Sequence, residues 1–149
     1  MTVPINIRTS GIRESLQWLD RKEERISNFA PFWRSVTPIL KSEVANVFAQ
    51  EGPNWRPLSP YTIAVRRFPG YPILYQTGAL ERSLTVDPFV VYGRSEFQFG
   101  TTNPYASDHE FGTDRIPARP FLRPAYENSK DRIRAEAIRY ITEQLASRN

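Results

Sequence analysis

The sequence of 149 residues predicts an α+β fold, in which a small, mainly antiparallel sheet has helices packed on one face and a long loop rich in proline and aromatic residues. Some stretches alternate apolar and polar residues, as half-buried strands do. Longer stretches repeat apolar residues at helical spacing. Residues 52–78 hold five prolines and show neither period. The chain is long enough for one hydrophobic core, so we expect a single domain over residues 1–149.

The first elements are a strand and a helix. Residues 3–7 alternate apolar and polar side chains, which predicts a strand. Pro4 limits this strand to a sheet edge or to the strand's first residues, because proline has no N–H to donate. Apolar residues then recur at helical spacing from Ile12 to about Asn28, which predicts an amphipathic helix.

A second helix is predicted from Pro31 to the Gly52-Pro53 pair. Proline suits the first turn of a helix, and glycine followed by proline ends one. Pro38 lies inside this pattern, so we expect the first turn to be separate or kinked. The loop of residues 52–78 follows, and loops of such length are usually functional or docked on a partner.

Short helical turns are expected within this loop and just after it. Ser59 can cap a helix over residues 60–67, because its hydroxyl can accept a free N–H and the next residue is proline. Thr77 is expected to cap a turn that carries Leu80 and Leu84.

Two strands and a helix complete the prediction. The strands span residues 85–92 and 96–101 and are joined at 93–95, and the alternation of Phe97 with Phe99 marks a buried face. An irregular stretch follows. The last helix is predicted from about Ala125 to Ala146.

Composition excludes several classes of site. The chain has no cysteine and one histidine, which removes disulfides, thiolate nucleophiles and multi-histidine metal clusters. No apolar stretch approaches the roughly 18 residues that a membrane span needs. We therefore expect no cofactor, no metal and no membrane partner, and a protein kept in the cytoplasm or carried in a particle assembled there.

The formal charge of +4 is compatible with two kinds of partner. Arginines outnumber lysines by 17 to 3 and are interleaved with carboxylates. Arginine is enriched and lysine depleted at protein interfaces, so the bias slightly favours a protein partner over nucleic acid. A small nucleic-acid-binding module stays open as an alternative, with a footprint formed by Arg66, Arg67, Arg82, Arg94, Arg115, Arg119 and Arg123.

The sequence holds no recognisable catalytic motif. His109 is the one candidate for acid–base chemistry, with Ser107 and Asp108 beside it. There is no G-x-S-x-G nucleophile turn and no glycine-rich phosphate loop. We therefore predict that the protein is not an enzyme, and that His109 is a packed, hydrogen-bonded part of a turn.

Several fragments in the middle of the chain form an ordered series. The first half consists of Trp55-Arg56-Pro57-Leu58-Ser59-Pro60-Tyr61-Thr62, Arg66 and Ile73-Leu74-Tyr75-Gln76-Thr77-Gly78-Ala79-Leu80-Glu81-Arg82-Ser83. The second half consists of Phe99-Gly100-Thr101, Tyr105-Ala106, His109-Glu110-Phe111-Gly112 and Ile116-Pro117-Ala118-Arg119-Pro120-Phe121-Leu122. In content and order this series resembles the phage virion morphogenesis, or tail-completion, family, with a departure at Ser107-Asp108, where the family tends to be apolar.

The resemblance implies a structural protein of the neck of tailed phages, present in the virion and assembled in the host cytoplasm. It implies a homo-oligomeric ring that completes the tail and joins it to the head, with a hexameric tail terminator favoured and a dodecamer second. A head-side adaptor or stopper ring of the connector is the alternative within this class. The expected partners are further copies of the chain, tail-tube and portal-proximal proteins, and weakly the DNA in the channel.

Two sets of residues are predicted to carry this function. The structural set, which shapes turns and caps, is Thr77, Gly78, Leu80, His109, Gly112, Pro117 and Pro120. The interface set is Trp55, Arg56, Tyr61, Arg66, Arg67, Arg119 and Phe121. The two prolines of residues 116–122 favour a stiff extended arm. In this arm we expect Phe121 to be held on its own subunit, and Arg119 to face the subunit interface.

Overall fold

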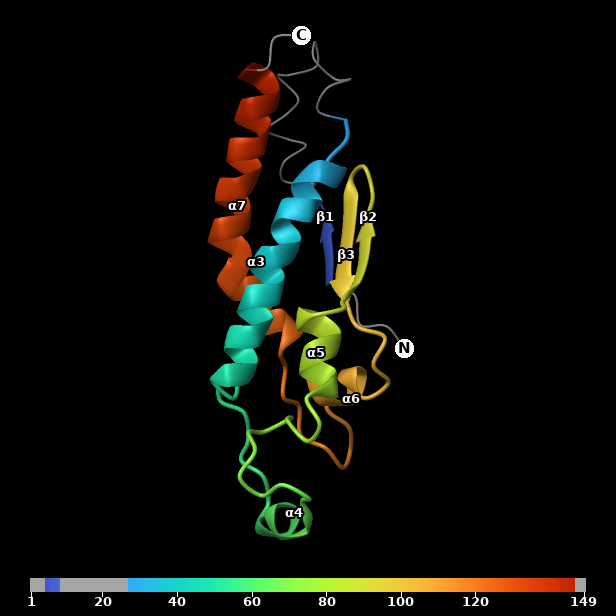
Figure 1. The fold of residues 1–149 in the computed structure, drawn as a ribbon, viewed down its shortest axis with the longest axis vertical. Coiled ribbons are helices and arrows are strands. Elements are labelled where there is room, and N and C mark those ends of the chain that lie inside the picture. Colours follow the sequence, from blue (N-terminus) through green and yellow to red (C-terminus); the bar gives the residue numbers. More distant parts are fainter. Residues whose placement is uncertain (1–4, 9–26, 147–149) are drawn as a thin grey trace.

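The computed structural model describes residues 5–8 and 27–146 and confirms the α+β fold (Figure 1). The helix predicted over 12–28 falls almost entirely on residues outside these ranges. The described elements, in chain order, are β1 (Ile5–Arg8), α3 (Ala30–Ala49), α4 (Pro60–Val65), α5 (Ala79–Thr85), β2 (Phe89–Tyr92), β3 (Glu96–Gly100), α6 (Ala106–Phe111) and α7 (Leu122–Ala146).

The described strands form an antiparallel sheet in the order β1-β3-β2. Ile5 pairs with Phe99 on one side of β3, and Val90 pairs with Phe99 on the other. Among the described strands β1 is thus an edge strand, one of the two positions that Pro4 allowed. The hairpin between β2 and β3 closes where the sequence predicted it, with the Gly93 N–H donating to the Glu96 carbonyl at 2.8 Å.

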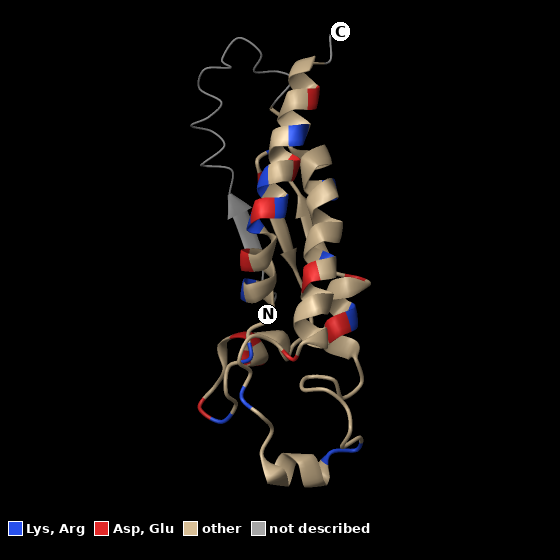
Figure 2. Cartoon of the chain, turned by 90° about the vertical axis from the view of Figure 1, so that its left-hand side faces the viewer, with Lys and Arg blue, Asp and Glu red and all other residues tan. Residues whose placement is uncertain are grey.

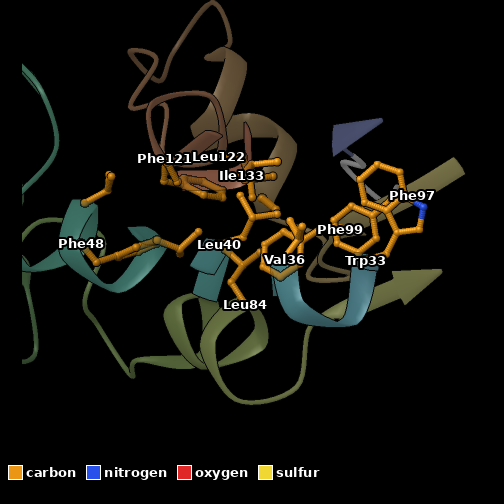
Figure 3. Packing of buried hydrophobic residues seen from close by; sticks show 14 of the residues in the cluster. Trp33, Val36, Leu40, Phe48, Leu84, Phe97, Phe99, Phe121, Leu122 and Ile133 are labelled. Carbon is orange, nitrogen blue, oxygen red and sulfur yellow. The ribbon is translucent and has the colours of Figure 1, made fainter. Parts of the chain in front are cut away.

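Helix α3 lies between the sheet and α7 and forms the centre of the core (Figure 1). The Trp33 ring of α3 stacks on Phe97 of β3, with ring centroids 5.2 Å apart. Figure 3 shows buried side chains from α3, α5, β3 and the start of α7 filling one continuous cluster. The largest fully buried side chains are those of Phe32, Trp33, Leu40, Leu84, Phe97, Phe99, Phe121 and Leu122.

Both ends of α3 follow the prediction, but its first turn is not separate. Pro31 lies in the first turn, and the helix continues without a break through Pro38. The other form of the prediction, a kink at Pro38, stays a prediction. At the other end the Glu51 and Gly52 N–H groups donate to the Phe48 and Val47 carbonyls, the pattern of a Schellman motif. Gly52 has a φ of +67°, and a Cβ there would lie 2.1 Å from the Trp55 ring.

Other boundaries need correction. Residue 85 ends α5, and the strand predicted from 85 begins at Phe89. Helix α6 occupies part of the stretch expected to be irregular, and α7 begins at Leu122 instead of Ala125. Helices as short as α5 and α6 contain too few residues to show a helical period. None of the helices in the described ranges has the length and apolar character of a membrane span.

Candidate interaction surface

Residues 53–75, here called the projecting segment, leave the body of the molecule after α3 and carry α4 at their far end (Figure 1). Not one residue of α4 is buried. Tyr61 and Val65 are 76% and 62% exposed, and Ile63 is exposed as well. Large apolar side chains that gather at an exposed point mark interaction sites in soluble proteins.

Hydrogen bonds fix the shape of this segment. The Ser59 hydroxyl accepts the Thr62 N–H at 3.1 Å and caps α4, as predicted. The Arg66 guanidinium donates to the Tyr71 carbonyl at 2.8 Å and to the Pro72 and Tyr75 carbonyls at 3.0 and 3.3 Å. This side chain therefore holds the returning half of the segment in place.

A further anchor joins the segment to the end of α3. The Glu51 carboxylate accepts the Ile73 N–H at 2.7 Å. The aromatic rings of Phe68 and Tyr71 stack at 4.9 Å, and both remain exposed. The segment is thus ordered without contributing the side chains of α4 to the core.

The base of the projecting segment is bonded to residues 116–122. The Trp55 indole donates to the Pro120 carbonyl at 2.9 Å. The buried Arg119 guanidinium donates through Nε and Nη2 to the Arg56 carbonyl, at 3.1 and 2.9 Å. Burial, and then the charge of Arg56, lower the pKa of Arg119. The arm predicted from its prolines is therefore docked on its own chain.

Glu110 caps α7 from another element. Its side chain is buried, and its carboxylate accepts the N–H groups of Phe121, Leu122 and Arg123 at 2.8, 3.0 and 3.0 Å. The first four N–H groups at the start of a helix have no partner within the helix. Here the fourth of these positions is Pro124, which has no N–H, so Glu110 binds all three N–H groups that are present. A negative charge is also favourable at this helix end.

Two further motif positions shape the same region. Gly112 has a φ of +75°, and a Cβ there would lie 2.7 Å from the Ala118 nitrogen, so the backbone role predicted for glycine is confirmed. The His109 carbonyl accepts the Arg119 N–H at 2.6 Å. His109 lies on α6 and not in a turn, and its Nδ1 is buried without a hydrogen-bond partner in the described part of the chain, so the expected hydrogen bond is not found there.

The Thr77-Gly78 pair starts α5, but with the roles shifted by one residue. Gly78 is the N-cap and has a φ of +70°, while the Thr77 hydroxyl accepts the Ala79 N–H at 3.3 Å. Leu80 is buried in the core. In the same helix the Ser83 hydroxyl lies 2.6 Å from that of buried Thr101, which links α5 to the end of β3.

Comparison with known proteins identifies the family of this chain. The sequence model of the phage virion morphogenesis family matches residues 9–145. The chain belongs to the phage virion morphogenesis family. It is 32% identical over 126 residues to the Mu-like prophage FluMu G protein 2 of Haemophilus influenzae, a match that covers 79% of this chain and 83% of that protein. No solved structure matches the chain.

The motif residues of this virion morphogenesis protein lie mostly in the interior of the monomer. Trp55 and Arg119 were predicted to contribute to an interface, but both side chains are buried in their own chain. Phe121 belonged to the same predicted set, and its burial agrees with the expectation that it is held on its own subunit. The prediction that Arg119 faces the subunit interface is therefore wrong, because its guanidinium is bonded to the Arg56 carbonyl. Arg66 is likewise bonded to carbonyls of its own segment.

The interface predictions for Arg56, Tyr61 and Arg67 stay predictions, and all three residues are exposed. Pro117 and Pro120 lie in the docked arm, which leads into the helix start that Glu110 caps.

Sequence reasoning missed Glu110 as a structural residue. Its neighbours gave no signal, because the N–H groups it binds are 11 to 13 residues away. Within the described ranges, no group of three potential metal ligands is present.

The titration of His109 offers a test of this geometry. Burial, and then the positive charge of Arg119, lower the pKa of His109, while Asp108 raises it by a smaller amount. The folded protein thus binds this proton less tightly than the unfolded chain does. Stability should therefore fall as the pH drops below about 6.5, the ordinary histidine value, and the loss should be complete below the folded pKa.

NMR titration can measure this pKa without assignment, because the chain has a single histidine. We expect a value below about 6.5, and a lower value still in Asp108→Asn. The variant His109→Gln should lose this part of the pH dependence of unfolding. A midpoint at or above the ordinary value would show that the imidazole is not buried near the charge of Arg119 as described.

Proposed function

We propose that this virion morphogenesis protein is a structural subunit of the phage neck or tail end. It forms a homo-oligomeric ring, with six copies favoured, that completes the tail and joins it to the head. The observation that supports this proposal is the projecting segment, which is held in shape by its own hydrogen bonds and yet presents an apolar helix to solvent. Ordering such a segment before binding reduces the entropy lost on association.

A head-side adaptor or stopper ring, with twelve copies as the second symmetry, is the alternative within this class. Both forms need the same kind of contact, in which one surface of a subunit meets a different surface of the next and the rotation closes. Closed rings made in this way need no catalytic site. The partners in this proposal are further copies of the chain, tail-tube proteins and portal-proximal proteins.

The nucleic-acid interpretation has less support than it had from the sequence. Two of the seven arginines in its expected footprint, Arg66 and Arg119, donate to backbone carbonyls of their own chain. Phosphate binding would weaken steeply with added salt, whereas apolar ring contacts would not. A basic channel that contacts DNA weakly is compatible with a neck ring.

Disruption of the gene in a phage that encodes this chain tests the proposal. We expect electron micrographs to show heads and tails that are not joined, and infectivity restored by the gene supplied in trans. A tail terminator predicts tails of uncontrolled length, because nothing stops tube polymerisation. A head-side adaptor predicts tails of normal length and heads that lose DNA. Normal numbers of joined, infectious particles would contradict both forms of the proposal.

A further inference from the structure

We propose that the tip of the projecting segment docks on helix α6 of a second copy of the chain, with Arg67 of one copy facing Asp108 of the next. This inference rests on the proposed ring and adds to it the two surfaces that meet. The first surface is the tip itself, formed by Tyr61, Ile63 and Val65 of α4 together with Arg67.

The tip is apolar and positively charged. From Gly52 to Leu80 the chain has three arginines and no acidic residue, and Figure 2 shows basic but no acidic positions on α4 and the chain next to it. Arg66 is bonded to carbonyls of the segment. Arg67 remains exposed shortly after α4, with its guanidinium 5.5 Å from the centre of the Phe68 ring. The tip therefore fits a surface that is apolar and acidic.

Helix α6 carries a surface of that kind. Tyr105, Asp108 and Phe111 follow one another at intervals of three, so they form one ridge along the helix. Tyr105, the N-cap residue, is 66% exposed and Phe111 is 62% exposed, although large aromatic side chains are mostly buried in folded proteins. The ridge thus places a carboxylate between two exposed aromatic side chains.

The charges of the tip and the ridge are not used by ion pairs within the described part of the chain. Each ion pair found there includes a residue of α7, and none involves Asp108 or Arg67. One copy therefore offers both a basic apolar tip and an acidic aromatic ridge. Contacts of tip to ridge repeat from copy to copy and can close into a ring. Burial of the rings supplies most of the affinity, and the charge pair sets the register.

Charge reversal in each surface tests the contact. In Arg67→Asp every tip faces a ridge of its own sign, and the same holds in Asp108→Arg. We expect each purified variant to assemble about tenfold more weakly than the unmodified chain, by native mass spectrometry and light scattering. Both residues lie outside the core, so thermal unfolding should change little.

Mixing the two variants is the decisive step. In an alternating ring the acidic tips of the R67D copies would meet the basic ridges of the D108R copies. The unchanged tips of the D108R copies would meet the unchanged ridges of the R67D copies, so every contact is again complementary. We expect a 1:1 mixture to recover assembly, with equal numbers of the two chains in each even-numbered ring. The control R134D, a reversal at an exposed arginine of α7, should assemble normally.

The outcomes separate this inference from the proposed ring. If both single variants form rings as well as the unmodified chain does, or if they fail and the mixture does not recover, the tip and the ridge do not meet and the inference is overturned. If R67D still forms rings but no longer binds a tail-tube protein, the tip binds that protein and not a second copy. This result would also overturn the inference. An unmodified chain that never assembles would refute the ring and the inference together.

Discussion

Replacing Glu110 with alanine should lower the free energy of unfolding by roughly 3–5 kcal/mol, because a buried hydrogen bond to a charged group contributes about 1.5–3 kcal/mol and water replaces only part of three such bonds. The carboxylate accepts the N–H groups of Phe121, Leu122 and Arg123 at the start of α7. Denaturant unfolding followed by circular dichroism measures the loss.

Two variants control this measurement. Glu110→Gln keeps one oxygen acceptor of similar shape and should lose less stability than Glu110→Ala. Asp108→Ala removes a carboxylate from the same helix that makes no comparable bonds in the described part of the chain, and should be close to neutral. If Glu110→Ala and Asp108→Ala unfold at the same denaturant concentration, the cap does not contribute as described.

Replacing Phe121 with alanine should cost about 3–5 kcal/mol, as truncation of a fully buried aromatic side chain does. The Phe121 ring is buried and lies 5.4 Å from that of Phe48, between the end of α3 and the start of α7. Its loss leaves a cavity where these helices meet. The melting temperature of the monomer should fall accordingly, as measured by calorimetry.

The matched control is Phe111→Ala, which truncates an exposed phenylalanine ring on α6. It should leave the melting temperature almost unchanged and weaken assembly, whereas Phe121→Ala should act on stability first. Equal melting temperatures for the two variants would show that Phe121 is not a core residue. If Phe111→Ala lost stability and Phe121→Ala did not, the ring of Phe111 would lie in the interior.

The parts of the fold that could be predicted from the sequence are those specified by local signals. The Ser59-Pro60 start of α4 and the β2–β3 hairpin depend on residues a few positions apart, and both are confirmed. The alternation of Phe97 with Phe99 likewise marked the buried face of β3 correctly. Such signals need no knowledge of the rest of the chain.

The parts that sequence reasoning missed depend on distant residues. The start of α7 is capped by Glu110, which lies 12 residues before Leu122 and so gave no local signal for the boundary. Arg119 has the character of an interface arginine in the sequence, yet its guanidinium meets a carbonyl 63 residues away. The residue type does not show whether a guanidinium is buried or exposed, because it can find a hydrogen-bond acceptor in either place.

The family motifs acquire a common physical meaning from these contacts. The Trp55-Arg56 fragment, the His109–Gly112 fragment and the arm of residues 116–122 meet at the base of the projecting segment. Their shared role is to hold that segment in a fixed position on the body. The residues at its tip then remain available to bind a partner.

Native mass spectrometry of the purified chain tests the central claim most directly, since that claim is that the chain is a self-assembling structural subunit. We predict a closed ring of a single stoichiometry, with six copies in the favoured form. The ring should persist when the salt concentration of the sample is raised before the buffer is exchanged for mass spectrometry. A chain that remains monomeric at every concentration, alone and with tail-tube or portal-proximal proteins, would contradict it.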